Sequence, residues 1–409
     1  MKVVGLIAEY NPFHNGHLYH IQKARELTGA EYVIVIMSGD FVQRGAPAVY
    51  DKYTRSLMAL KSGADLVLEM PSVFATSSAE DFASCGVALL DQLGIVDSIC
   101  FGSECGEVQP LFKIAAVLAE EHGDYQELLK DYIRSGLTYP DARAKALSSW
   151  LSLSPLESSL LLSPNNILGI EYIKALLRRK SGITPVTVKR NGHGYHDLSL
   201  SGEFASATAI RKLLASPDGL ISIASQVPEQ VLEAILQGMP VFPDDLTSIL
   251  NYTLLTLIRD GGDLTEYLDI SEELAGRIRN LFLQFKSFTE RTEDLKTKQY
   301  TYSRISRCLL HLILGSRQAD AAAYREKGYC GYARVLGFKK ESADLLTGIK
   351  KHSSLPLITK PAAAGSYIDA VFLPMFSQDL YASHVYNSIV YTKYGITVKN
   401  EYTRPFVMI

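Results

Sequence analysis

Short apolar runs alternate with amphipathic stretches over the first hundred residues. The apolar runs are rich in β-branched residues and cover residues 3–8, 32–37, 65–70 and 96–101. Runs of this kind are typical of strands that are buried on both faces. The stretches between them show apolar residues at helical spacing and cover residues 17–28, 50–62 and 78–93. This alternation predicts an α/β fold in which helices cover a Rossmann-like, doubly wound parallel sheet.

The next hundred residues extend the same domain. Residues 107–180 have mainly helical periodicity, a fifth strand is predicted at 184–190, and a helix with a hydroxyl-rich start is predicted at 206–216. In a sheet of this type, ligands bind beyond the carboxyl ends of the strands, at the point where the strand order reverses. We therefore expect a first domain at 1–215 with a ligand-binding site at that edge of its sheet.

The C-terminal region, residues 216–409, is expected to be mostly helical with a β-containing tail. The tail includes the apolar runs AVFLPMF at 370–376 and GITVKN at 395–400. From Glu290 to the end, Lys and Arg outnumber Asp and Glu, although the whole chain has a net charge of −3. Such an imbalance indicates a local basic surface that could face an acidic polymer while the rest of the chain remains acidic.

Composition narrows the class of protein. With 47% hydrophobic residues, the chain has the composition of a globular protein, and its apolar runs are shorter than the roughly 18 residues that a membrane span needs. We expect no membrane association, and the N-terminus has no export signal, so the predicted location is the cytoplasm. The five cysteines form no C-x-x-C pair and no zinc pattern, which favours reduced thiols and no protein-bound metal.

The stretch EYNPFHNGH at 9–17 directly follows the first predicted strand and enters the first predicted helix. Gly16 would let the backbone approach a ligand closely, and the helix start would attract a phosphate. Imidazoles at this place can donate hydrogen bonds to phosphate oxygens as charge builds in a transition state. We therefore expect His14 and His17 to be catalytic, although an isolated H-x-G-H sequence would favour a helix cap beside a partly buried histidine.

Together with ASATAIRKLL at 205–214, this stretch resembles the nucleotidylyltransferase superfamily, which shares a histidine–glycine–histidine signature and a late Ser/Thr–Ile–Arg helix start. The further motifs MSGDFVQRGAPA, FGSE, SPNNILG and LKTKQYTYSRISR resemble the bacterial tRNA(Met) cytidine acetate ligase family over most of the chain. The resemblance implies an ATP-dependent ligase that makes acetyl-adenylate from acetate and ATP. The acetyl group would then pass to N4 of the wobble cytidine of elongator tRNA(Met), with Mg²⁺ accompanying the triphosphate.

The resemblance also implies an ATP site. We expect it to contain Ile7, Ala8, Glu9, Tyr10, Asn11, Pro12, Phe13, His14, Asn15, Gly16, His17, Gly102, Asn165, Asn166, Lys189, Arg190, Ser206, Thr208 and Arg211. Ser206 and Thr208 would meet phosphate at a helix start, and Arg211 would add a fixed charge. For Gly102 the competing interpretation is a tight turn at a strand end, and for the paired asparagines it is a helix cap.

We expect the loop after the second predicted strand to bind the carboxylic acid substrate or the acceptor base. Gln43 and Arg44 could hold acetate, phosphate or the entering base, and Asp40 is included with them. Asp40 departs from the neutral residue that is more usual in the family. Its charge would repel acetate unless Arg44 or a metal ion screened it, and a solvated loop is an equal alternative for it.

A basic stretch with tyrosines lies between Asp294 and Asp320, where no acidic residue occurs. Cations beside aromatic rings are typical of sites that bind phosphates and splayed bases of RNA. The tRNA-binding residues are accordingly expected to be Lys296, Lys298, Tyr300, Arg304 and Arg307. A solvated, charged helix face is the other interpretation of this stretch.

Two other functions fit part of the sequence. A small-molecule adenylyltransferase would use the same nucleotide domain, but it would leave the C-terminal half and its basic stretch without a role. A catalytically silent RNA-binding protein could keep a nucleotide pocket for regulation. The presence of both His14 and His17 argues against that second alternative.

Overall fold

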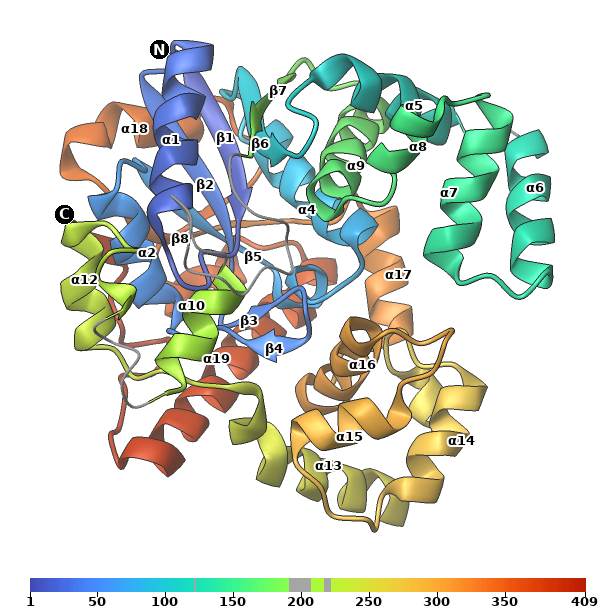
Figure 1. Cartoon of the computed structure of the whole chain (residues 1–409). Coiled ribbons are helices and arrows are strands. Elements are labelled where there is room, and N and C mark those ends of the chain that lie inside the picture. The colour runs from blue at the N-terminus through green and yellow to red at the C-terminus, as the bar shows by residue number, and fades with distance from the viewer. Residues whose placement is uncertain (121–122, 191–206, 217–221) are drawn as a thin grey trace.

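One mostly parallel sheet forms the centre of the protein (Figure 1). The structure is a computed structural model, and it describes residues 1–120, 123–190, 207–216 and 222–409. The five predicted strands are present as β1 (Val3–Ala8), β2 (Tyr32–Ser38), β5 (Leu66–Met70), β6 (Ser98–Ser103) and β7 (Thr184–Lys189). They are parallel and lie in the order β5-β2-β1-β6-β7, so the strand order reverses between β1 and β6. The prediction of a doubly wound sheet is confirmed.

Strands from the C-terminal region complete this sheet. β8 (Ala333–Phe338) pairs antiparallel with β5, and β9 (Leu357–Ile358) and β10 (Val407–Met408) pair parallel with β8. The chain segments on either side of the expected boundary at residue 215 therefore share one sheet.

The tail contains strands, as expected, but the two runs that were predicted to form them, 370–376 and 395–400, are not among them. Residues 370–372 form a 3₁₀ turn, and residues 373–376 begin the long helix α19 (Leu373–Tyr394). Pro374 lies in the first helical turn, where a missing N–H costs nothing, and Met375 and Phe376 are buried. The apolar run is thus the buried side of a helix start. Residues 395–400 follow the left-handed cap Gly395 and form no strand.

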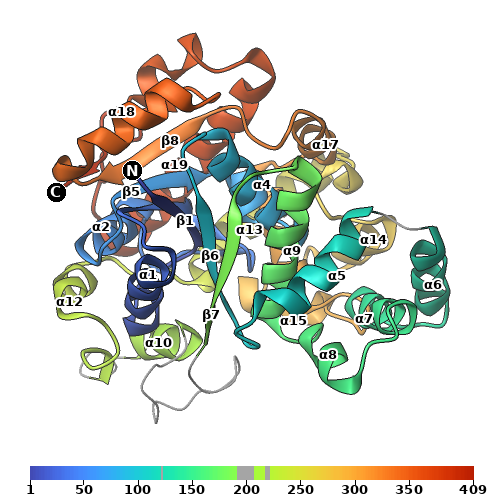
Figure 2. The ribbon, with the colours of Figure 1, turned by 90° about the horizontal axis from the view of Figure 1, so that it is seen from above.

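Helices cover both faces of the sheet (Figure 2). One face carries α1 (Asn15–Thr28), α2 (Lys52–Lys61), α10 (Ala207–Leu214) and α12 (Glu229–Leu236). The other carries α3 (Ser72–Ala75), α4 (Ala79–Gln92), α5 (Val108–Glu120), α9 (Pro164–Arg179), α18 (Ala343–His352) and α19. Successive strand residues point to opposite faces, so Val33 joins the first core and Ile34 the second. Both faces are therefore apolar, as the near-continuous runs predicted.

Two groups of helices extend from this body (Figure 1). The first contains α6 (Gly123–Arg134), α7 (Tyr139–Trp150) and α8 (Pro155–Leu160). The second, which we call the helical module, contains α13 (Thr247–Arg259), α14 (Glu272–Leu281), α15 (Phe288–Leu295) and α16 (Tyr302–Leu314), and α17 (Gln318–Glu326) follows it. The module has its own apolar core, which Phe41 joins from the short hairpin β3 (Phe41–Val42) and β4 (Ala46–Pro47). Within the described ranges, we find no helix that is both long enough and apolar enough to cross a bilayer.

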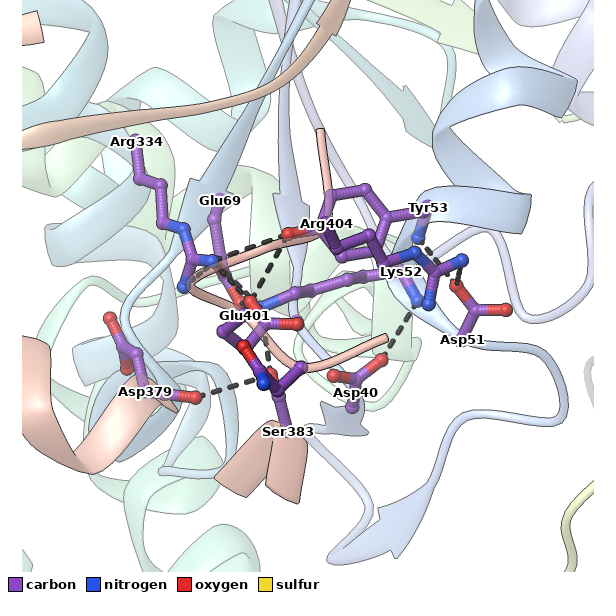
Figure 3. Close-up of polar contacts among 12 residues, drawn as sticks. Asp40, Asp51, Lys52, Tyr53, Glu69, Arg334, Asp379, Ser383, Glu401 and Arg404 are labelled. Carbon is purple, nitrogen blue, oxygen red and sulfur yellow. Dashed lines mark hydrogen bonds and ion pairs between the residues drawn. The ribbon is translucent and has the colours of Figure 1, made fainter. Parts of the chain in front are cut away.

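A buried cluster of charges connects the first and last parts of the chain (Figure 3). The Lys52 ammonium of α2 lies 2.8 Å from Glu69 of β5 and 2.9 Å from Glu401 near the C-terminus. Arg334 of β8 pairs with both carboxylates and lies 3.0 Å from Glu69. Burial by itself raises the pKa of Glu401, but Lys52 and Arg334 outweigh burial and lower that pKa to about 2. Both carboxylates are thus needed to neutralise the two cations.

We predict that Glu401→Gln lowers the free energy of unfolding by about 3–5 kcal/mol, because it leaves buried Lys52 and Arg334 with one carboxylate between them. Urea unfolding at neutral pH measures this change. The control is Glu341→Gln, because the Glu341 side chain is 79% exposed and its neighbour Lys339 is 3.9 Å away. Equal stability of the two variants would show that the cluster does not hold the C-terminal segment.

Candidate active site

A cavity of about 490 Å³ opens at the carboxyl ends of β1, β6 and β7, where the strand order reverses. Sixteen of the residues predicted for ATP, acetate or the acceptor base line it. They are Ile7, Ala8, Glu9, Tyr10, Asn11, His14, Gly16, His17, Gln43, Arg44, Gly102, Asn165, Lys189, Arg190, Thr208 and Arg211. The cationic residues among them outnumber the lining carboxylates, Glu9 and Glu104, which suits an anionic ligand.

Some predicted residues support the cavity from behind. Phe13 is fully buried, and its ring packs 5.5 Å from the ring of His17. Pro12 is buried beside it, and the Asn15 amide donates to the carbonyl of Ser225 at 3.0 Å. The Asn166 carboxamide accepts hydrogen bonds from backbone N–H groups in the turn after β6. Ser206 lies outside the described residues.

His14 and His17 are held together at the start of α1. His14 is the N-cap residue, and its Nδ1 accepts the N–H of Gly16 at 3.1 Å. In return, Nδ1 of His17 accepts the N–H of His14 at 3.3 Å, which completes a reciprocal cap built from two imidazoles. The rings are stacked with centroids 3.7 Å apart. A Cβ at position 16 would lie 2.9 Å from Cε1 of His14, so only glycine leaves room for the His14 ring in this position.

Both imidazoles are neutral at physiological pH. Burial, followed by the charges of Arg190 and Arg211, lowers the pKa of His14 to about 3. Burial and then His14, Arg190 and His20 hold the pKa of His17 far below its usual value. A neutral imidazole whose Nδ1 accepts a hydrogen bond carries its proton on Nε2. Each ring therefore keeps one N–H donor, which can stabilise charge on a phosphate oxygen.

Helix α10 places a guanidinium against the same turn. Arg211 donates to the carbonyl of Asn11 at 2.8 Å and to the hydroxyl of Thr208 at 2.9 Å. The start of α10 and its arginine thus lie beside the histidine pair, in the arrangement expected for phosphate binding.

The other side of the cavity is ordered around Glu104. Its carboxylate accepts hydrogen bonds from the backbone N–H groups of Asn165 and Asn166 and from the Asn165 side chain at 2.7 Å. Arg190 then donates to Oδ1 of Asn165 at 3.0 Å. This chain fixes an amide and a guanidinium between β6, β7 and α9. Glu104 thus orients Asn165 and, through it, Arg190. It belongs to the FGSE motif identified in the sequence.

Several lining residues were not predicted. They are Tyr19, His20, Phe82, Phe101, Leu168, Tyr172, Val188 and Ala207. His20 follows His17 by one helical turn, and that spacing is the signal that could have found it. The rings of Phe101 and Tyr172 lie 5.6 Å apart and give the cavity an aromatic wall. Local sequence contains no signal for this wall, because the two rings come from different elements.

Asp40 does not line the cavity. Its side chain is buried and accepts the backbone N–H of Lys52 at 2.8 Å, at the start of α2. Burial raises the pKa of this carboxyl. Asp40 therefore anchors the loop that carries Gln43 and Arg44, and it does not face the cavity as a solvated loop residue or as a ligand.

The predicted tRNA-binding residues differ in exposure. Lys296 and Lys298 are exposed between α15 and α16. Tyr300 is buried, and its hydroxyl lies 2.6 Å from that of Ser271, so its ring offers no free face for a base. The Arg304 guanidinium lies 4.7 Å from the Tyr300 ring centroid. Arg307 lies 3.8 Å from Asp269 and is mostly buried. Of the five residues, the two lysines are thus the most accessible.

A doubly wound sheet that brings stacked imidazoles and the arginine of a short helix to its crevice is the arrangement expected of the nucleotidyl transferase class. In agreement, the family model for HIGH nucleotidyl transferases matches residues 1–401. In Caldanaerobacter subterraneus subsp. tengcongensis, a protein named tRNA(Met) cytidine acetate ligase is 43% identical, with full coverage of both chains. The protein of that name from Clostridium acetobutylicum is 41% identical and covers 88% of this chain and 90% of its own.

Solved structures agree with this assignment. Thermotoga maritima TmcAL bound with alpha-thio ATP is 32% identical, with a TM-score of 0.91 over 100% of this chain and 99% of that one. The apo form has a TM-score of 0.93 at 33% identity, with full coverage of both chains. The chain belongs to the tRNA(Met) cytidine acetate ligase family.

The neutral histidines predict a pH-dependent stability. Burial lowers the pKa of His20 to about 4, with Arg190 adding to the effect. Unfolded histidine binds a proton below about pH 6.5, whereas the folded sites stay neutral. The unfolded state therefore binds more protons, and the free energy of unfolding falls as the pH drops from 6.5 toward 4.

Each such histidine contributes up to about 1.4 kcal/mol per pH unit to this fall. We expect His20→Asn to reduce the slope, as measured by urea unfolding at intervals between pH 7 and 4.5. The exposed His352→Asn serves as the control. An unchanged slope in the His20 variant would contradict an imidazole that stays neutral in the folded protein.

Proposed function

We propose that the protein activates acetate with ATP and transfers the acetyl group to N4 of the wobble cytidine of elongator tRNA(Met). The observation that carries this proposal is the pair of neutral, stacked imidazoles beside Arg211 at the crevice of a nucleotidyl transferase sheet. The family relatives, which are named for this reaction, support the choice of substrates. The proposed place of the reaction is the cytoplasm.

In the first step, a carboxylate oxygen of acetate attacks the α-phosphorus of ATP. The bond between the α-phosphorus and the bridging oxygen breaks, and pyrophosphate leaves with that electron pair, so that acetyl-adenylate remains. Nε2–H groups of His14 and His17 and the guanidinium of Arg211 would bind the triphosphate as its charge shifts toward pyrophosphate, which the hydrogen bonds that orient these three side chains support. The amide of Asn165 and the aromatic wall would hold the adenosine.

Mg²⁺ would supply further charge neutralisation for the leaving pyrophosphate. This ion keeps several waters and binds mainly to substrate phosphates. The cavity offers few carboxylates to such an ion, which suits binding through the substrate. Glu104 already accepts three hydrogen bonds, whereas Glu9 accepts one, from the N–H of Gln43 at 3.0 Å. Glu9 is thus the lining carboxylate that could reach the ion or its water.

In the second step, the cytosine amine attacks the acetyl carbonyl, AMP leaves, and a proton is released from the amine. An acyl phosphate anhydride is reactive enough for this transfer to depend mainly on placing the amine correctly. No side-chain nucleophile is required. The exposed lysines between α15 and α16 would bind the phosphates of the RNA.

His17→Ala is expected to lower the rate of acetate-dependent exchange between ATP and pyrophosphate by about 100–1000-fold, because it removes a donor to the phosphates in the transition state. Exchange of radiolabelled pyrophosphate into ATP measures this rate, and tRNA affinity is expected to stay unchanged. His352→Ala is the matched control on an exposed helix end. Full exchange activity in the His17 variant would refute the proposed role of the imidazoles.

The double variant Lys296→Ala with Lys298→Ala is expected to weaken tRNA binding and to make it less sensitive to salt, because fewer counterions are released. Filter binding across a series of salt concentrations measures both effects, while pyrophosphate exchange stays unchanged. The control removes two exposed lysines of α18, Lys350 and Lys351. Loss of exchange in the Lys296 variant without RNA would contradict separate sites for RNA and adenylate.

A further inference from the structure

The turn between β3 and β4 lies between the nucleotide cavity and the helical module. Gln43 and Arg44 of this turn line the cavity. The next residue, Gly45, touches α16, where the hydroxyl of Ser306 donates a hydrogen bond to the Gly45 carbonyl at 2.9 Å. One short turn therefore contacts both parts of the protein.

The contact at Gly45 leaves no room for a side chain. A Cβ there would lie 2.3 Å from the backbone nitrogen of Arg307 and 2.4 Å from the carbonyl carbon of Ser306. These are helix backbone atoms, which cannot move aside as the end of a flexible side chain can. The residue also has a φ of +75°, which favours glycine. The position of the turn is thus set by direct backbone contact with α16.

Further contacts fix the hairpin on both sides. Phe41 is buried in the core of the helical module and lies 6.2 Å from the ring of Tyr386 on α19. The Tyr386 hydroxyl donates to the carbonyl of Ala48 at 2.9 Å. On the cavity side, the N–H of Gln43 donates to Glu9 at the end of β1. The hairpin is therefore a bridge from the C-terminal helices to the catalytic turn.

Arg44 brings a further guanidinium to the cavity. Arg44 lines the same cavity as Glu9, at the end of β1, and Arg211. Burial lowers the pKa of Arg44 while the charge of Glu9 raises it, and burial lowers the pKa of Arg211, with the charge of Arg44 adding to that effect. The triphosphate would occupy Arg211 and the histidines. A second planar guanidinium beside them matches a carboxylate, which it can bind through two parallel hydrogen bonds.

We propose that Arg44 binds the carboxylate of the acyl donor and that α16 is its positioning element, acting through Ser306 and the close contact at Gly45. The inference rests on the proposed function, since it assumes a carboxylic acid as the substrate. It assigns the helical module a part in adenylate formation in the absence of RNA. The module thus contributes to acid recognition as well as to RNA binding.

The test measures acetate-dependent pyrophosphate exchange without tRNA, and it compares Gly45→Ala with Gly315→Ala. Gly315 caps α16 with a φ of +73°, similar to that of Gly45, but a Cβ there would meet no atom within 4 Å. The control therefore reproduces the backbone strain without the contact. We expect Gly45→Ala to raise the KM for acetate about tenfold or more and to change the KM for ATP less than about twofold. Gly315→Ala should change neither.

A milder variant covers the case in which Gly45→Ala does not fold. Ser306→Ala removes the hydrogen bond to the turn, and Ser303→Ala, on the same helix, is its control. We expect a selective rise in the KM for acetate in the Ser306 variant, in the same direction as for Gly45→Ala. Unchanged acetate kinetics in both variants, or equal effects on acetate and ATP, would overturn the positioning role. Absence of acetate-dependent exchange in the unmodified protein would instead refute the proposed function itself.

Discussion

The structure depends on two buried cations of helix α2, Lys52 and Arg55, since neither charge can leave water without partners. Lys52 finds carboxylates on β5 and in the C-terminal segment. Arg55, one turn later, donates to the carbonyl groups of Glu9, Ser38, Gly39 and Tyr50. Lys52 and Arg55 can both reach these partners only where the ends of β1, β2 and β5 lie side by side. The buried cations thereby hold together the ends of β1, β2 and β5, next to the end of β1 from which the cavity-lining turn begins.

The charges that line the cavity also explain why its histidines are neutral. Positive charge in the cavity comes from guanidiniums such as Arg44, Arg190 and Arg211, which stay charged at any physiological pH. Burial, together with the charges of Arg190 and Arg211, lowers the pKa of His14 and keeps it neutral. The guanidiniums can then attract an anionic nucleotide, while the imidazoles act as oriented N–H donors whose direction is fixed by the cap of α1. Charge and orientation are supplied by different residues.

Local patterns were sufficient to predict the five parallel strands β1, β2, β5, β6 and β7 and most of the residues that line the cavity. Parallel strands bring their carboxyl ends to one edge, and motifs such as H-x-G-H follow those ends directly. Local patterns failed where distant segments decide the outcome. The pairing of β8 with β5 depends on a partner more than 250 residues away, and the aromatic wall joins two elements. The alternation of charge and tyrosine around Tyr300 could not reveal that this ring is buried under Arg304.

The connection between the helical module and the crevice has a chemical rationale. An acyl adenylate is an anhydride that water can destroy, so the acceptor amine should be near when the anhydride forms. Under the proposed function, a helical module that binds RNA and also holds the turn between β3 and β4 would place both reactants by one packing arrangement. Phe41 in the module core and Gly45 against α16 provide that arrangement without a flexible linker. The sheet adds a second anchor, because β8, which follows α16 and α17 in the chain, pairs with β5.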